Sequence, residues 1–75
     1  MILPDKTIRL ANSLLSVGSI VLGTLREPRT VSDAWTRVRA NPHVMSFEVF
    51  VLALDFLHAV GLVTIEEGLL VRRRH

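Results

Sequence analysis

The sequence contains no cysteine and only three histidines among its 75 residues. Without thiols the chain can form neither a disulfide nor a thiolate metal site. The histidines are scattered and have no paired carboxylate at ligand spacing, so no metal centre is expected. The serines at 13, 16 and 19 lie in an apolar segment with no base in reach. We therefore expect no catalytic residue, no cofactor and no enzymatic activity.

A hydrophobic run long enough to cross a membrane is also missing. The uncharged segment Leu10–Leu25 has 16 residues and includes asparagine, serine and threonine, whereas a helical span needs about 20 mostly apolar residues. A signal peptide is a poor match as well, because Asp5 precedes this segment and Arg26, Glu27 and Pro28 follow it. These features predict a cytoplasmic protein with no membrane partner.

The chain has little excess charge of either sign. Nine Lys and Arg against seven Asp and Glu give a formal net charge of +2, so the surface is not strongly basic. Hydrophobic residues, by contrast, make up 49% of the sequence. A single domain over residues 1–75 has difficulty burying so much apolar material, and small domains of this kind are often completed by oligomerisation or by a partner. We expect a subunit that is oligomeric or aggregation-prone when isolated.

What is present is a clear helical period. A first helix is expected from about Lys6 to Leu25, with two adjoining apolar stripes. One stripe consists of Ile8, Ala11, Leu15, Gly18 and Leu22, and the other of Leu10, Leu14, Val17, Val21 and Leu25. Gly18 falls within a stripe, where the close approach of another helix would explain a glycine.

A short second helix and an apolar third helix follow. Thr30 or Ser32 is expected to cap the second helix, which ends before the Asn41-Pro42 break. Ser46 is the expected N-cap of the third helix, which runs from Phe47 to about Val60. Its apolar arc is wider than one core requires, so it is predicted to be the central core helix with apolar surface left over for a partner.

After Gly61 the pattern changes to two β-branched runs, Leu62–Glu66 and Leu69–Arg73, separated by the turn residues Glu67-Gly68. The fold is therefore predicted to be mostly α with a C-terminal β-hairpin. Three helices followed by a hairpin is the order of a winged-helix domain, with the third helix in the recognition position and the hairpin as the wing.

The third helix lacks the side chains that read DNA. A base-reading helix presents Arg, Lys, Asn, Gln, Ser or Thr, and the segment from Phe47 to Val60 contains none of them. Its charged residues, Glu48 and Asp55, would be repelled by phosphates. We expect this winged helix to be a protein–protein module. Apolar candidates for its partner interface are Leu14, Val21, Trp35, Phe47, Phe50, Val51 and Leu54.

Arginines supply the candidates for contact with nucleic acid or an acidic partner. Three of them are adjacent at the C-terminus and two flank the Asn-Pro turn: Arg72, Arg73, Arg74, Arg37 and Arg39. Adjacent arginines can contact phosphates without sequence specificity. A solvated terminus that keeps the hairpin edge soluble explains the same pattern.

Several stretches resemble one family of small proteins across nearly the whole chain. They are Ile2–Lys6, Ile8–Leu10, Ser13–Leu15, Thr30-Val31 with Trp35, Phe47, Phe50–Asp55, Gly61–Val63 and Gly68–Leu70. The sequence is similar here to the middle components of bacterial ABC-three-component systems, whose operons resemble Lamassu-type anti-phage defence systems. The resemblance implies two protein partners, an effector subunit and an ATPase related to the chromosome-maintenance (SMC) and Rad50-like proteins. The resemblance further implies that the ATPase senses DNA, so that this chain would be associated with DNA through the complex.

Two other functions remain open at this point. A free-standing winged-helix transcriptional regulator would bind a promoter fragment with salt-dependent sequence selectivity. A small antitoxin-like protein would neutralise a toxin. The leading hypothesis is a non-catalytic subunit that bridges or regulates the ATPase and the effector.

Overall fold

The long first helix, α1, spans Asp5–Thr24, one residue earlier at each end than predicted. It is seen in a computed structural model that describes residues 5–44 and 46–73. Both predicted stripes enter the core through their C-terminal residues: Val17, Val21 and Leu25 of one stripe are buried, and so is Gly18 of the other. The N-terminal residues of both stripes, such as Leu10 and Ile8, are exposed.

The two following helices begin where the capping residues predict. α2 spans Val31–Val38, and the Thr30 hydroxyl accepts a hydrogen bond from the backbone N–H of Asp33 at 3.1 Å, so Thr30 rather than Ser32 is the N-cap. α3 spans Phe47–Ala59, and the Ser46 hydroxyl accepts from the N–H of Val49 at 3.2 Å. Such caps satisfy amides that have no partner within the helix. α2 is eight residues long and, as predicted, ends before the Asn41-Pro42 break.

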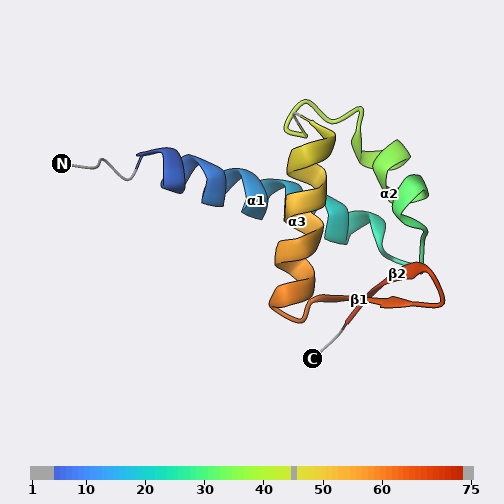
Figure 1. Ribbon diagram of the computed structural model, residues 1–75. Coiled ribbons are helices and arrows are strands. Elements are labelled where there is room, and N and C mark those ends of the chain that lie inside the picture. Colours follow the sequence, from blue (N-terminus) through green and yellow to red (C-terminus); the bar gives the residue numbers. More distant parts are fainter. Residues whose placement is uncertain (1–4, 45, 74–75) are drawn as a thin grey trace.

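The C-terminal segment forms the predicted antiparallel hairpin. β1 spans Val63–Glu66 and β2 spans Leu69–Arg72, with Ile65 opposite Leu70. The turn residues Glu67 and Gly68 both have positive φ, 53° and 78°, as a two-residue hairpin turn of type I′ requires. The structure thus confirms the fold class, three helices with a C-terminal wing (Figure 1).

One residue outside the hairpin extends the sheet. The backbone N–H of Arg29 donates to the Leu70 carbonyl at 3.1 Å, and the Leu70 N–H donates to the Arg29 carbonyl at 2.6 Å. The loop between α1 and α2 therefore runs beside β2, on the side opposite β1. This bridge ties the wing to the helices.

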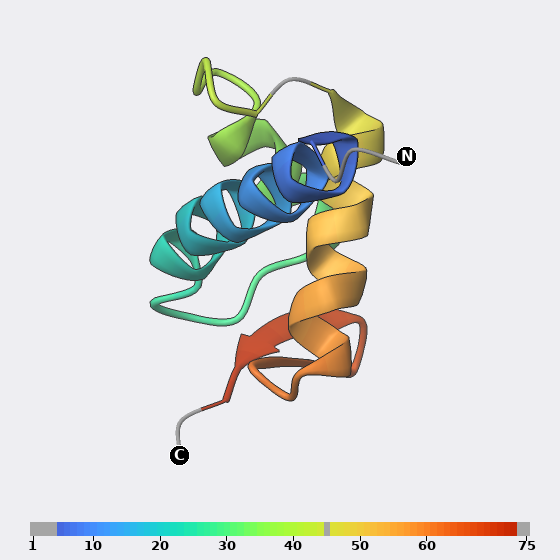
Figure 2. The same cartoon turned by 90° about the vertical axis from the view of Figure 1, so that its left-hand side faces the viewer.

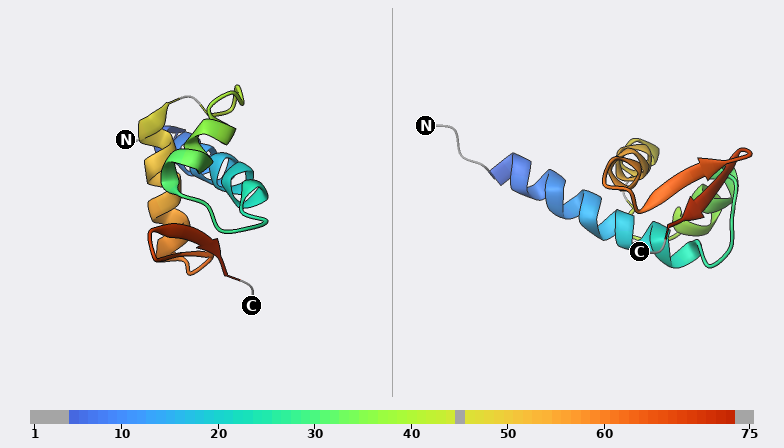
Figure 3. Two further views of the ribbon diagram at one scale, coloured as in Figure 1. Left: turned by 90° about the vertical axis from the view of Figure 1, so that its right-hand side faces the viewer. Right: turned by 90° about the horizontal axis from the view of Figure 1, so that it is seen from below.

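The core lies where α1 and α3 cross. Figure 2 shows α3 crossing α1, and the right-hand view of Figure 3 shows α3, α2 and the wing on the same side of α1. Gly18 is buried at the crossing, where a Cβ would lie 3.3 Å from Cδ2 of Leu57. Three rings hold α2 to the start of α3: the Trp35 centroid is 5.1 Å from that of Phe47 and 5.2 Å from that of Phe50. Such aromatic pairs add to the stabilisation from apolar burial.

The N-terminal half of α1 projects beyond this core. Figure 1 and the right-hand view of Figure 3 show it extending well past α3 and the wing. The radius of gyration is 12.8 Å and the longest extent is 46 Å, whereas a compact chain of this length has a radius of about 11 Å. None of the helices within the described ranges combines the length and hydropathy that a bilayer span requires.

Candidate interaction surfaces

The first candidate surface is the projecting part of α1. Ile8 and Leu15 are 51% and 55% exposed, and Ala11 between them is also exposed. These residues are the N-terminal part of a predicted stripe whose later residues, Gly18 and Leu22, reach the core. We call Ile8, Ala11 and Leu15 the α1 stripe. Exposed apolar side chains that form a contiguous patch on a small protein are typical of an interaction site.

Two of the residues expected at a partner interface are instead in the core. Val21 and Phe50 are both 0% exposed and pack with the other buried side chains. This corrects the sequence-based assignment of these two residues, since a fully buried side chain cannot touch another protein without unfolding. Both lie on faces of α1 and α3 that the helix crossing closes.

The other five interface candidates reach the surface. Phe47 is 50% exposed, and the remaining four are partly buried against the core: Leu14, Trp35, Val51 and Leu54. They do not form one patch, because Leu14 lies on α1 whereas Val51 and Leu54 lie on the side of α3 that lines the hollows described next. Their role in binding stays a prediction.

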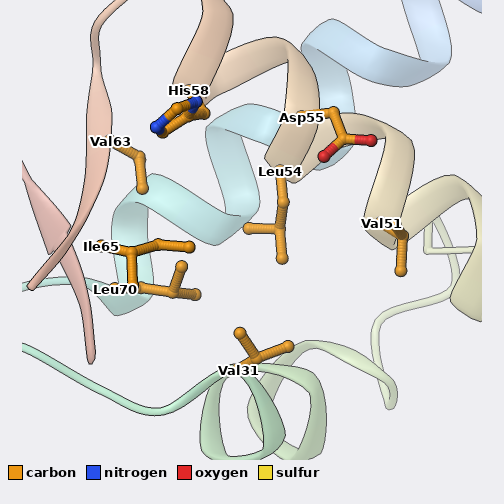
Figure 4. Close-up of a pocket in the computed structure, with 8 residues that line it drawn as sticks. All are labelled: Val31, Val51, Leu54, Asp55, His58, Val63, Ile65 and Leu70. Atoms are coloured by element: carbon orange, nitrogen blue, oxygen red, sulfur yellow. The ribbon is translucent and has the colours of Figure 1, made fainter. Parts of the chain in front are cut away.

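The second candidate surface is a hollow between α3 and the wing, with a volume of about 290 Å³. Figure 4 shows it lined by side chains from α3, from both strands and from the start of α2: Val31, Val51, Leu54, Asp55, His58, Val63, Ile65 and Leu70. A shallower hollow of about 390 Å³ lies further along α3, among Phe47, Glu48, Val51 and Leu52. The two hollows share Val51 and lie one after the other along α3. Together we call them the α3–wing groove.

The charged residues of this groove are acidic. Glu48 and Asp55 are both exposed, and neither makes an ion pair within the described part of the chain. This face therefore carries uncompensated negative charge next to apolar side chains. Phosphates would be repelled here, while a cationic group on a protein would be attracted.

The candidate arginines do not gather in one basic patch. Arg37 donates to the Asp33 carboxylate at 3.3 Å, and Arg39 follows α2 as an exposed residue. Arg72 donates to the Leu22 carbonyl at 3.4 Å, next to an exposed Arg73. The end of α2 and the end of β2 lie at opposite ends of the molecule in Figure 1 and Figure 2. Arg74 lies outside the described residues.

Sequence reasoning missed the most connected arginine. The Arg29 side chain is 14% exposed and donates to the Thr24 carbonyl at 2.7 Å and to the Asp33 carboxylate at 2.9 Å; Glu27 lies 3.4 Å away. The hydrogen bond from Arg29 lowers the pKa of Asp33, and Arg37 adds to this effect. The i,i+4 spacing of Arg29 and Asp33 was a signal that could have indicated the pair.

Within residues 5–44 and 46–73, no three His, Asp or Glu side chains are grouped so that they could hold a metal ion.

The comparisons with known proteins identify a family. The model of the family described as "ABC-three component (ABC-3C) system Middle Component 6" matches residues 3–74. No curated protein and no solved structure matches the chain.

Proposed function

The chain belongs to the middle component 6 family of ABC-three component systems, and we propose that it is a non-catalytic subunit that bridges the other two components. A middle component acts together with partner proteins. In this proposal the partners are an ATPase related to the SMC and Rad50-like proteins and an effector subunit, in a cytoplasmic anti-phage defence complex. The ATPase would hydrolyse nucleotide and sense DNA.

The observation that carries the proposal is the α1 stripe. It projects from a small domain and it is apolar, whereas the core uses the C-terminal half of the same helix. Isolated helix turns are marginally stable in water. A protein that covers the projecting apolar segment would therefore stabilise its helical conformation. A free monomer has no evident use for this surface.

A transcriptional regulator has less support. In a winged helix α3 would lie in the major groove, yet its outer face presents Glu48, Asp55 and apolar side chains. Arg72 and Arg73 remain candidate contacts with DNA or an acidic partner, through non-specific phosphate binding. Sequence-selective, salt-dependent binding of the purified chain to a promoter fragment would favour the regulator instead.

The test is to express the tagged chain with the genes that flank it and to identify the proteins that co-purify. We expect the ATPase and the effector in near-stoichiometric amounts. The variant Ile8→Asp/Leu15→Asp should lose at least one of them, because a carboxylate on the stripe would have to be desolvated in the interface. Asn12→Asp/Ser16→Asp is the matched control, since both of these exposed residues lie on the more polar side of the same segment. A wild-type chain that purifies alone, as a monomer, contradicts the proposal.

A further inference from the structure

α3 carries a second, mostly apolar seam beside its core face. The core face is formed by Phe50, Ala53 and Leu57, all buried. The second seam lies roughly a quarter-turn around the helix. It consists of residues separated by four, three and four positions, the apolar Phe47, Val51 and Leu54 followed by His58. This is the spacing by which a helix packs its a and d positions against a second helix. Among the described residues, no side chain of α1 lines either hollow beside the seam.

The shape of the surface suits a helix better than a small molecule. The seam lies along one wall of the α3–wing groove, and Ile65, which is 59% exposed, stands on the opposite wall with Val31 (Figure 4). Small-molecule sites usually enclose about 300–1,000 Å³ and contain a few convergent polar groups. Here the hollows follow the helix axis over more than two turns, and an amphipathic helix can lie in such a groove with its apolar face inward.

The charges beside the seam specify the occupant further. Glu48 and Asp55 are seven residues apart, so they lie on the same side of α3, about 10 Å apart along the helix axis. If the seam residues are taken as the a and d positions of a heptad, Glu48 and Asp55 both occupy the e position beside them. Groups at such positions pair with opposite charges on the facing helix and decide which helix binds.

We propose that the α3–wing groove binds an amphipathic helix of a partner protein, with an apolar seam flanked by two basic residues seven positions apart. The identity of the protein that supplies this helix rests on the proposed function, and a bridging subunit needs a second binding surface besides the α1 stripe. The helix binds through its apolar seam, and its two cations pair with Glu48 and Asp55.

A second copy of this chain does not supply such a helix. Between Ile8 and Leu25, α1 has only Arg9 as a cation, and Lys6 precedes it by three positions rather than seven. In α2 the only cation is Arg37, and Arg39 follows two positions later. α3 contains neither lysine nor arginine. None of these helices matches the spacing of the two acids.

The test uses the purified full chain and two fluorescein-labelled synthetic helices of about three heptads. Both have a Leu/Ile seam; one carries Arg at two flanking positions seven residues apart and the other carries Glu there. Fluorescence anisotropy at low salt should show that the Arg helix binds about tenfold more tightly than the Glu helix. In Glu48→Lys/Asp55→Lys this preference should reverse, and in Glu48→Gln/Asp55→Asn it should disappear.

The control variant is Glu66→Lys/Glu67→Lys, which makes the same charge change on two exposed wing residues that line neither hollow. It should keep the preference for the Arg helix. Circular dichroism verifies that each variant is folded, and the neutral variant serves where the charge reversal impairs folding. The inference is overturned if neither helix binds, if both bind equally, or if Val51→Asp abolishes self-association of the chain without changing helix binding.

The two proposals can fail separately. If the Arg helix binds as described but the tagged chain does not co-purify with an ATPase and an effector, the bridging function is wrong and the groove stands. The opposite result is that both proteins co-purify with the wild type and with the neutral variant, while the wild type shows no preference between the two helices. The proposed helix-binding role of the groove is then wrong, and the bridging function stands.

Discussion

Arg29 connects three segments that are far apart in the sequence. Its side chain donates to the end of α1 at Thr24 and to Asp33 in α2, while its backbone pairs with Leu70 in the wing. Hydrogen bonds from a charged group are stronger than those between neutral groups. These two are partly buried, and without Arg29 the Thr24 carbonyl would lose its side-chain donor. At the scale of single residues, this arginine has the largest predicted effect on stability.

Replacing Arg29 by alanine should therefore lower the free energy of unfolding by about 1–3 kcal/mol. Urea denaturation followed by the fluorescence of Trp35, the only tryptophan, measures the change. Arg26→Ala, at an exposed position in the same loop, is the control and should change stability by less than about 0.5 kcal/mol. Equal midpoints for the two variants would contradict this role of Arg29.

The Asp33 carboxylate gives this contact a pH dependence. Its pKa is lowered in the folded protein, first by the hydrogen bond from Arg29 and then by Arg37. A carboxylate of this kind stabilises the fold above its ordinary pKa, and the contribution is lost as the pH falls through the lowered value. Asp33→Asn should melt at a lower temperature than the wild type at pH 7. The difference should shrink on acidification below about pH 4, and a difference that does not vary with pH would count against the ion pair.

At the scale of the element, α1 contains two glycines in different surroundings. At Gly18 an added Cβ would lie 3.3 Å from Leu57, whereas at Gly23 nothing lies within 4 Å. Glycine is unfavourable in a helix because it loses more backbone entropy on folding than other residues. The structure therefore justifies Gly18 by the close crossing of α3 and offers no packing reason for Gly23.

Substitutions at these two glycines should have opposite signs. Gly23→Ala should stabilise the protein by about 0.5–1 kcal/mol through helix propensity alone. Gly18→Val should destabilise it by about 1–3 kcal/mol, because the larger side chain forces α1 and α3 apart. Thermal melts of both variants beside the wild type test the pair. A stabilising Gly18→Val would mean that the crossing is looser than the structure indicates.

At the scale of the whole molecule, the distribution of apolar surface is the unusual property. The core closes around the second half of α1, and both the α1 stripe and the α3–wing groove stay open. Small domains bury a limited fraction of their surface, so this chain cannot cover all its apolar residues alone. In our proposal, partner proteins of the multi-component system cover the apolar surface that the fold leaves exposed.

The isolated chain is accordingly expected to self-associate through the α1 stripe. Sedimentation velocity should show species larger than a monomer whose proportion rises with concentration. Ile8→Asp/Leu15→Asp should shift the distribution to monomer and leave the free energy of unfolding of the monomer within about 0.5 kcal/mol, since both side chains are exposed. Asn12→Asp/Ser16→Asp should not have this effect. Monomeric wild type at all concentrations would refute the expectation.

Local patterns in the sequence were sufficient for the elements. Helical period, the Ser46 cap and the Glu67-Gly68 turn predicted the helices and the hairpin to within two residues, because these signals act between neighbours in the chain. Their order also predicted the winged-helix layout, and the family resemblance predicted the family that the comparison shows. The partner surfaces were predicted less well, as Val21 and Phe50 demonstrate.

The sequence by itself determined that α1 has two apolar stripes and that α3 is apolar on most of its circumference. Only the tertiary structure decided which part of α1 enters the core, because a helical period gives the angle of each side chain around the axis of its own helix and does not say where a neighbouring helix crosses it. The crossing at Gly18 and Leu57 makes that choice. Val21 and Phe50 are buried in the resulting core, whereas Ile8 and Leu15 are exposed and the second seam of α3 lines the hollows.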